Sequence, residues 1–279
     1  MIVMALARQT SVRNVGVCHD AEYTALDIAG HLGLEDPQRL VWRAGGINHM
    51  TWFLGLEVDG HDVYPELRAR AASGMLDNDR TDAVRIELLR RFGYFVSESS
   101  VHNAEYYPWF ISREGAAERY GVRLREYLYR LDKLEQEFQE ARRGSGPAVD
   151  TEEDLSPEYA PKIISALETN EAYSFMGNVA NEGNLIANLP DDCCVEVPCL
   201  VKGGTIVPGR VGKIPEQCAG LNRTAINVQL LAVQGILNED RDALRQAAYM
   251  DPLLSAQLGL HEISNLIDDL LAAHEKAAG

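Results

Sequence analysis

The sequence predicts an α/β or α+β fold that ends in a helical tail, and three patterns predict it. A short apolar stretch at residues 12–18 leads through a polar turn into a segment with helical periodicity at 21–34. Asp59-Gly60 and Gly203-Gly204 each separate two apolar stretches, which is typical of β-hairpins. The last third of the chain repeats apolar residues at helical spacing. Strands mixed with helices indicate an α/β or α+β class.

The elements follow from the same periodicities. In the helix expected at 21–34, the apolar residues that recur at helical spacing are Ala25, Leu26, Ile28, Ala29 and Leu32. The long charged segment 116–143 carries a stripe formed by Leu124, Leu128, Leu131 and Leu134, and 142–156 is expected to be a loop. We expect strands at 12–18, 51–58, 61–64, 193–201 and 205–207, and helices at 21–34, 82–92, 116–143, 161–169, 216–237, 240–249 and 253–277.

Charge and cysteine content exclude several classes of protein. The chain has 279 residues, with 42 acidic against 26 basic side chains and a net charge of −16. Such a chain repels nucleic acids and anionic membrane surfaces, so we expect neither as a partner. No apolar run approaches the roughly 18 residues of a membrane span. Five cysteines without a C-x-x-C pair indicate reduced thiols and a cytoplasmic protein.

Cys18 and His49 are the first candidates for chemistry. Cys18 lies at the carboxyl end of the strand expected at 12–18 and precedes a helix N-terminus, where the helix dipole favours a thiolate. A thiolate is a nucleophile or a metal ligand, and the alternative is a buried core cysteine. His49 follows Gly45 and Gly46, which permit close approach of the backbone, and its imidazole could join Cys18 on a metal. The alternative for His49 is a structural role.

Two further segments combine polar and aromatic residues. Residues 92–109 have no clear period, so we expect a loop that lines a site, with a solvated loop anchored by aromatic residues as the alternative. Residues 177–190 hold asparagines and glycines among apolar residues, which predicts a constrained turn with bonds from side chain to backbone.

In this order, the motifs resemble the family 4 glycoside hydrolases, which depend on NAD⁺ and a divalent metal. The matching segments are V-G-V-C-H at 15–19, G-I-N-H-M-T-W at 46–52, F-G-Y-F-V-S-E-S-S at 92–100, H-N-A-E-Y-Y-P-W-F at 102–110, G-N-V-A-N-E-G-N-L-I-A-N-L-P at 177–190 and V-E-V-P at 195–198. S-E-S-S followed by E-Y-Y-P-W-F is closer to the branch that acts on unphosphorylated α-galactosides than to the 6-phosphoglycoside branch. The resemblance implies a C-terminal domain like that of lactate and malate dehydrogenases, with mixed helices and antiparallel hairpins.

The resemblance also implies a mechanism that departs from hydrolysis by two carboxylates. NAD⁺ takes hydride from sugar C3, a base removes the C2 proton, a divalent metal (usually Mn²⁺) stabilises the negative charge, the aglycone leaves, water adds and hydride returns. By position, the residues implied are Cys18 and His49 for the metal, His19 for leaving-group departure, Glu98 as the base with Tyr106 in reserve, and Asn48, His49 and His102 for the substrate.

Two features depart from the family pattern. Asp20 stands where this branch more usually has serine. The chain also lacks a G-x-G-x-x-G motif, and we expect residues 1–20 to be only the last helix and strand of a dinucleotide-binding domain, with 21–279 forming the catalytic and oligomerisation domain of a dimer or tetramer. A strand at 12–17 without its sheet partners would expose unpaired backbone, so we expect the chain alone to aggregate or to bind a partner.

Two other functions are compatible with the residues. One is a non-catalytic domain that binds metal or sugar, or that needs a separate NAD-binding chain. The other is a cysteine hydrolase in which Cys18 is the nucleophile and His19 or His49 is the base.

Overall fold

The computed structural model describes residues 1–144 and 159–278. In this part the strands form one seven-stranded sheet, with the order β1-β5-β6-β2-β3-β4 and with β7 paired to β6. Every pairing in it is antiparallel. The strands are β1 (Gly16–Val17), β2 (Leu40–Ile47), β3 (Met50–Val58), β4 (His61–Asp62), β5 (Tyr173–Ala180), β6 (Cys194–Lys202) and β7 (Thr205–Pro208). The expected class of mixed helices and antiparallel hairpins is confirmed.

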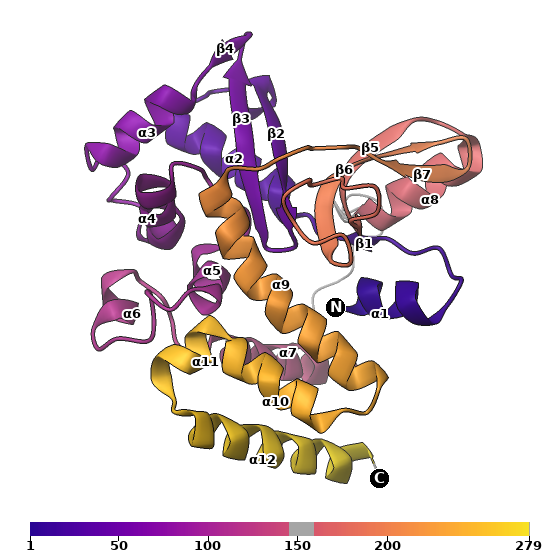
Figure 1. Cartoon of the computed structure of the whole chain (residues 1–279). Helices are drawn as coiled ribbons and strands as arrows, with labels where there is room; N and C mark the ends of the chain where they lie inside the picture. Colours follow the sequence, from indigo (N-terminus) through magenta and orange to yellow (C-terminus); the bar gives the residue numbers. More distant parts are fainter. Residues whose placement is uncertain (145–158, 279) are drawn as a thin grey trace.

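Helices surround the sheet and continue below it to the C-terminus (Figure 1). They are α1 (Ile2–Gln9), α2 (Asp20–Leu32), α3 (Tyr64–Ala72), α4 (Ala83–Phe92), α5 (Ser100–Tyr106), α6 (Ala116–Arg119), α7 (Glu126–Arg142), α8 (Tyr159–Thr169), α9 (Glu216–Leu237), α10 (Arg241–Met250), α11 (Pro252–Gln257) and α12 (Leu260–Ala278). None of the helices in the described ranges is long and apolar enough to cross a bilayer.

The sheet separates two apolar cores, and β3 contributes to both. Successive residues of a strand point to opposite faces, so Trp52 and Phe53, both fully buried, belong to different cores. Phe53 belongs to the core that includes side chains of α2 and α3, whereas Trp52 belongs to the core that includes side chains of α8 and α9. The Trp52 indole N–H donates to Asn222 Oδ1 of α9 at 2.8 Å, which fixes the long helix against the sheet.

The first strand is much shorter than predicted. Residues 12–18 were expected to form a buried strand, but only Gly16 and Val17 are in a strand. This strand lies at the edge of the sheet, antiparallel to β5. Val12 and Val17 are exposed because β1 has a neighbour on one side only. The predicted order of strand, polar turn and helix is present, with α2 beginning where expected, but the strand is shorter and more exposed than predicted.

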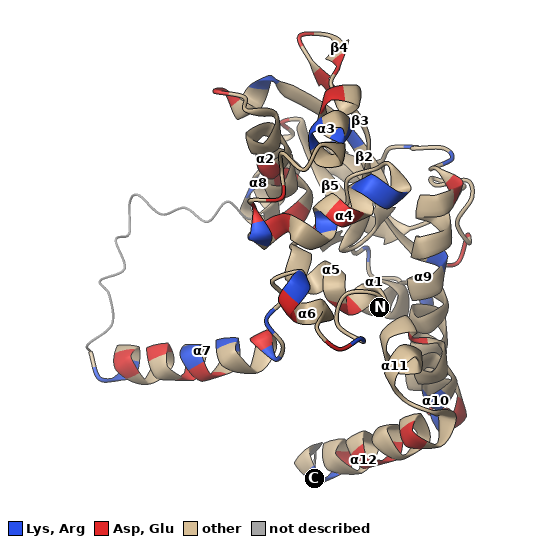
Figure 2. Ribbon diagram, turned by 90° about the vertical axis from the view of Figure 1, so that its left-hand side faces the viewer, with Lys and Arg blue, Asp and Glu red and all other residues tan. Residues whose placement is uncertain are grey.

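The charged segment 116–143 is two helices rather than one. Gly121, with φ of 66°, and Arg125, with φ of 62°, lie between α6 and α7 in the left-handed region, which ends a right-handed helix. Helix α7 contains no buried residue, so the leucine stripe faces solvent, and Figure 2 shows α7 projecting from the body. The loop expected at 142–156 lies, beyond Gly144, outside the described residues.

Other predictions of secondary structure need correction. Residues 92–109 were expected to be a loop, but Ser100–Tyr106 form α5, whose first residue follows the Ser99 N-cap. Strands β2 and β5 were not predicted, because glycine and asparagine weaken the strand pattern of both segments. Residues 253–277 form α11 and α12, separated by an extended Leu258 and by Gly259, rather than one helix. The hairpins around Asp59-Gly60 and Gly203-Gly204 are confirmed.

Candidate metal centre

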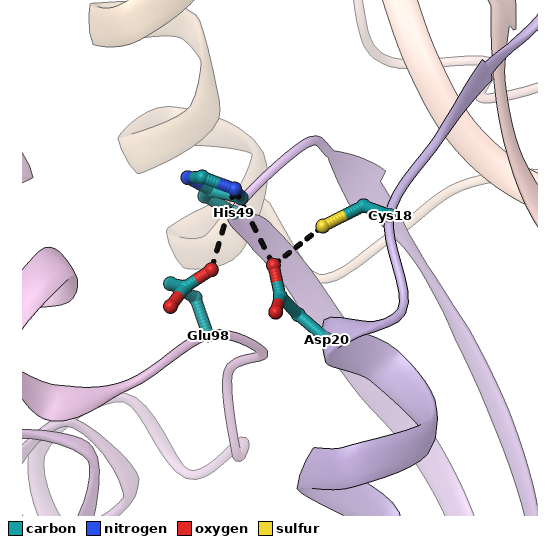
Figure 3. Close-up of side chains that lie close together, drawn as sticks. All are labelled: Cys18, Asp20, His49 and Glu98. Atoms are coloured by element: carbon teal, nitrogen blue, oxygen red, sulfur yellow. Dashed lines mark hydrogen bonds and ion pairs between the residues drawn. The ribbon is translucent and has the colours of Figure 1, made fainter. Parts of the chain in front are cut away.

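Four side chains from three segments meet at one end of the sheet. Cys18, Asp20, His49 and Glu98 each offer one ligand atom, and these atoms all lie within 4.8 Å of one another. Figure 3 shows the four side chains turned toward a common point. The set combines a thiol, an imidazole and two carboxylates, which together can bind a divalent transition metal.

Cys18 and Asp20 are placed by the junction between β1 and α2. Pairing of β1 with β5 fixes the backbone up to Val17, and α2 begins at Asp20, so that Cys18 lies in the short turn between them. An acidic residue in the first helical turn is favoured by the helix dipole. This turn brings Cys18 Sγ within 2.5 Å of Asp20 Oδ2.

His49 is placed by the tight turn that joins β2 to β3. Ile47 pairs with Met50, so Asn48 and His49 are the two residues of the turn, and His49 has a φ of 65°. Gly46 permits this close return of the chain, because a Cβ there would lie 2.4 Å from the Met50 carbonyl oxygen. The expectation of close backbone approach at Gly46 is confirmed.

Glu98 lies in the connection between α4 and α5 and also has a positive φ, 73°. Its oxygens face in two directions. Oε1 accepts the Ser99 backbone N–H at 2.8 Å and lies 3.1 Å from His102 Nδ1. Oε2 lies 3.3 Å from His49 Nε2. One oxygen is thus anchored in its own turn, and the other faces the cluster.

The two acidic residues of the cluster have opposite pKa shifts. Burial, and then the hydrogen bond with Glu98, raise the pKa of Asp20 to about 6. Burial alone would raise the pKa of Glu98 too, but hydrogen bonds from Asp20 and the Ser99 N–H, with the nearby imidazoles, lower it to about 2. Glu98 therefore holds the negative charge, and Asp20 retains a proton more readily than an ordinary aspartate.

The prediction of an easily ionised Cys18 is wrong for the metal-free protein. Burial raises the pKa of the Cys18 thiol, and its hydrogen bond to Asp20 raises it further. A hydrogen bond from the Asp20 backbone N–H lowers the pKa but does not outweigh these effects. Burial lowers the pKa of His49, which keeps the imidazole neutral, the form that binds metals.

Tyr106 and His102 of α5 flank His49. Tyr106 Oη lies 2.7 Å from His49 Nδ1, and the His102 ring stacks on the His49 ring at 5.8 Å. In the tautomer in which Nδ1 donates to Tyr106, Nε2 presents its lone pair to Asp20 and Glu98. Burial raises the pKa of Tyr106, so its phenol stays protonated and fits an orienting role better than that of a base.

The remaining predicted residues lie at the rim. Asn48 is exposed at the turn beside His49. His19 caps α2, with Nε2 3.8 Å from Asp20 Oδ1 and its ring edge-on to Tyr23. All predicted site residues therefore come from segments that meet here.

Sequence reasoning missed two acidic residues. Asp20 was noted only as a departure, yet it lies within 3.3 Å of His49 Nε2 and bonds Cys18. Glu196 of β6 is only 2% exposed and hydrogen-bonds Thr51 and Asn178, and its charge influences the pKa of Cys18. A lone glutamate between valines of a buried strand was the available signal.

A family comparison identifies the chain. The sequence model of the family 4 glycosyl hydrolase C-terminal domain matches residues 44–254, three quarters of the length. The chain belongs to the family 4 glycosyl hydrolases. It is 40% identical over 272 residues to an α-galactosidase of Bacillus subtilis and 32% identical over 278 residues to an α-galactosidase of Rhizobium meliloti. These matches cover 97% and 95% of this chain but only 62% and 56% of the relatives, so this family 4 chain spans less than two thirds of their length.

Solved structures share the fold at low identity. A 6-phospho-β-glucosidase from Thermotoga maritima, solved with manganese, NAD⁺ and glucose-6-phosphate, has a TM-score of 0.73 at 19% identity and covers 99% of this chain and 63% of its own. A 6-phospho-α-glucosidase from gut microorganisms, solved with NAD and Mn²⁺, has a TM-score of 0.70 at 20% identity, with coverage of 99% and 64%. At these identities the likeness establishes the fold of the family 4 chain.

Proposed function

We propose that this chain forms the metal- and sugar-binding part of a glycosidase that cleaves α-galactosides. The observation that carries the proposal is the cluster of Cys18, Asp20, His49 and Glu98. Relatives named α-galactosidase, at 40% and 32% identity, support the choice of sugar. The solved relatives that hold Mn²⁺ support a divalent cation as the ligand of the cluster.

The donor atoms fit such a cation. Cys18 Sγ and His49 Nε2 would hold it, with Asp20 as a further oxygen ligand, because Asp20 Oδ2 already contacts both. Binding would displace the protons of Cys18 and Asp20, since metal ligands must be deprotonated. A cation held there supplies Lewis-acid stabilisation of negative charge on sugar oxygens.

The described residues do not fit NAD⁺. A dinucleotide fold binds pyrophosphate at a glycine-rich turn between a parallel strand and a helix. Here the strand before α2 is two residues long and antiparallel to β5, and Cys18-His19-Asp20 fills the turn. The sequence contains no G-x-G-x-x-G motif. We therefore assign no step of hydride transfer to residues of this chain.

The chain's own residues supply proton transfer and binding. Glu98 is ionised at neutral pH and its Oε2 borders the cation position, so we assign it as the acceptor of a proton from the sugar; because its low pKa makes it a weak base, a bound cation would have to make that proton more acidic. Tyr106 orients His49 through Nδ1. His19 at the rim is placed to assist the leaving group, and Asn48 and His102 can bond sugar hydroxyls.

The electrostatics of the site favour an unphosphorylated sugar. Three carboxyl groups, those of Asp20, Glu98 and Glu196, influence one another there. Across the described part of the chain, the ion pairs and hydrogen bonds of these three groups involve no lysine or arginine. A sugar phosphate would meet negative charge rather than a basic partner.

A cysteine hydrolase is disfavoured. The Cys18 thiol donates its hydrogen bond to Asp20 rather than to an imidazole, and its pKa is raised. The division at residue 20, the dimer or tetramer and the cytoplasmic location stay predictions.

Calorimetry with methyl α-D-galactoside, with and without Mn²⁺, tests the proposal. We expect binding that requires the metal, exceeds that of glucose 6-phosphate and weakens in His102→Ala. Adding NAD⁺ and a separately produced dinucleotide-binding half of a relative should then yield hydrolysis of p-nitrophenyl α-D-galactoside. Galactoside binding without turnover in that mixture would identify a non-catalytic domain, and the absence of metal-dependent binding would contradict the proposal.

A further inference from the structure

Glu98 has a backbone conformation that a glutamate rarely adopts. Its φ of 73° lies in the left-handed region, which costs a non-glycine residue roughly 1–2 kcal/mol. Because this conformation turns Oε2 toward His49 Nε2, 3.3 Å away, the arrangement of the cluster depends on it. Neighbouring structure must therefore stabilise the turn at residues 97–99.

Asn103 makes the contacts that hold this turn. Its side-chain amide donates to the carbonyl oxygens of Ser97 at 2.8 Å, Glu98 at 3.3 Å and Ser99 at 3.2 Å. The Asn103 side chain is completely buried, one helical turn into α5. The Ser99 carbonyl also accepts the Asn103 backbone N–H at 2.9 Å, so the two side-chain N–H groups are needed chiefly by the carbonyls of Ser97 and Glu98.

The other amide atom of Asn103 shows which part of the side chain is needed. Its Oδ1 is buried and accepts no hydrogen bond from the described residues. Burying an unpaired oxygen is unfavourable, so the residue is not explained by ordinary packing. The N–H donors toward residues 97–99 account for asparagine at this position.

The start of the turn is also tied to β3. Ser97 N–H donates to the Thr51 carbonyl at 2.7 Å, and Thr51 N–H donates to Ser97 Oγ at 3.2 Å. Thr51 lies two residues after His49, so the turn that carries Glu98 is fixed relative to the strand that carries His49. Asn103 therefore decides the direction of Glu98 on an already anchored segment.

We propose that Asn103 is a positioning residue that holds Glu98 in its left-handed conformation and thereby keeps the negatively charged Glu98 carboxylate facing the divalent-cation position. This inference rests on the proposed function, because it concerns the same cluster. Asn103 touches none of the other three residues of the cluster in the hydrogen bonds of the described chain, so its effect on the cation passes through Glu98.

The first experiment measures Mn²⁺ affinity of Asn103→Leu by calorimetry. Leucine has a similar volume and removes both the donors and the unpaired oxygen. We expect about 10- to 100-fold weaker binding, the usual effect of losing a residue that orients a metal site. Asn103→Ser retains one donor and should lose less Mn²⁺ affinity. It replaces the leucine variant in the experiment if that variant does not fold.

Asn181→Leu is the matched control. The Asn181 amide is also fully buried and donates to three carbonyl oxygens, of Ile186, Leu189 and Pro190, in another loop. Its loss should lower the melting temperature without changing Mn²⁺ affinity. Equal loss of affinity in both asparagine variants would overturn the proposal, because it would reflect general destabilisation.

A double-mutant cycle with Glu98→Gln separates positioning from structure. If Asn103 acts through Glu98, Asn103→Leu should cause little further loss of affinity when Glu98 is already glutamine. Additive losses would overturn the inference, as would unchanged affinity in Asn103→Leu or in Glu98→Gln. Cys18→Ser is the control in both cases and should still abolish binding. Absence of Mn²⁺ binding in the wild-type chain would instead overturn the proposed function and this inference together.

Discussion

The buried Glu196 allows a quantitative prediction for Glu196→Gln. Its Oε2 lies 2.5 Å from Thr51 Oγ1, and Thr51 Oγ1 also lies 3.1 Å from the Ile47 carbonyl oxygen. A threonine hydroxyl has one proton and cannot donate to both oxygens. A protonated Glu196 resolves this, because it donates to Thr51 while Thr51 donates to Ile47.

The same conclusion follows from the electrostatics. Burial raises the pKa of Glu196 from 4.5 to about 7, and the charges of Asp20 and Glu98 raise it, while hydrogen bonds from Thr51 and Asn178 partly oppose the shift. Below pH 4.5 the Glu196 carboxyl is protonated in both the folded and the unfolded state, so it does not lower the stability of the protein. Between pH 4.5 and 7 only the unfolded state releases the proton, so stability falls as pH rises, and the full cost is reached above pH 7.

The magnitude follows from about 1.4 kcal/mol per unit of pKa. The raised pKa of Glu196 therefore lowers the free energy of unfolding by about 1 kcal/mol at pH 5 and by about 3 kcal/mol at pH 8. Glutamine keeps the hydrogen bonds, since its amide can donate to Thr51 and accept from Asn178, but it does not titrate. The free energy of unfolding of Glu196→Gln minus that of wild type should thus increase by about 2 kcal/mol from pH 5 to pH 8.

Urea unfolding of both proteins in EDTA at the two pH values measures this difference. Glu168→Gln, at an exposed position of α8, is the control and should show no pH-dependent difference. A difference for Glu196→Gln that is the same at pH 5 and pH 8 would refute the reasoning, because it would mean that Glu196 is ionised in the folded protein throughout this range.

Three further substitutions test the packing around the site. Gly46→Ala should destabilise the protein by about 1–3 kcal/mol in urea unfolding, because the new Cβ would lie 2.4 Å from the Met50 carbonyl oxygen; unchanged stability would refute that close approach. Asp82→Ala removes one of the two carboxylates that pair with the buried Arg85 guanidinium and leaves Asp27, so calorimetry should show a loss of about 1–3 kcal/mol, and an unchanged stability would refute the contribution of this pair. Leu131→Ala on α7, a helix without buried residues, should stay within about 0.5 kcal/mol of wild type, and a larger loss would show that the stripe packs against something.

The sequence predicted most of the helices and strands. It also identified most residues of the cluster, but not how they are arranged. The hairpin at Asp59-Gly60 and helix α2 could be predicted, because turn chemistry and helical periodicity are local. Strand β2 could not, since Gly45 and Gly46 have low strand propensity and the strand exists through its pairing with β3.

The site shows the same division between local and tertiary effects. Cys18 and His49 were predicted as ligands from their segments, but the role of Asp20 follows from a turn geometry that the sequence pattern does not show. The positive φ of His49 belongs to the two-residue turn between β2 and β3, and that of Glu98 to a turn that contacts Asn103 and Thr51. The raised pKa of Cys18 likewise comes from burial, which no local motif reveals.

A Co²⁺ titration tests the central claim, that Cys18 and His49 hold a divalent cation. Thiolate ligation of Co²⁺ gives a near-ultraviolet charge-transfer absorption, whereas carboxylates alone do not. We predict that this band appears and saturates at one equivalent, disappears in Cys18→Ser, weakens in His49→Ala and persists in Cys193→Ser, a buried cysteine outside the cluster. A band that survives in Cys18→Ser, or no saturable binding to the wild-type chain, would contradict the account.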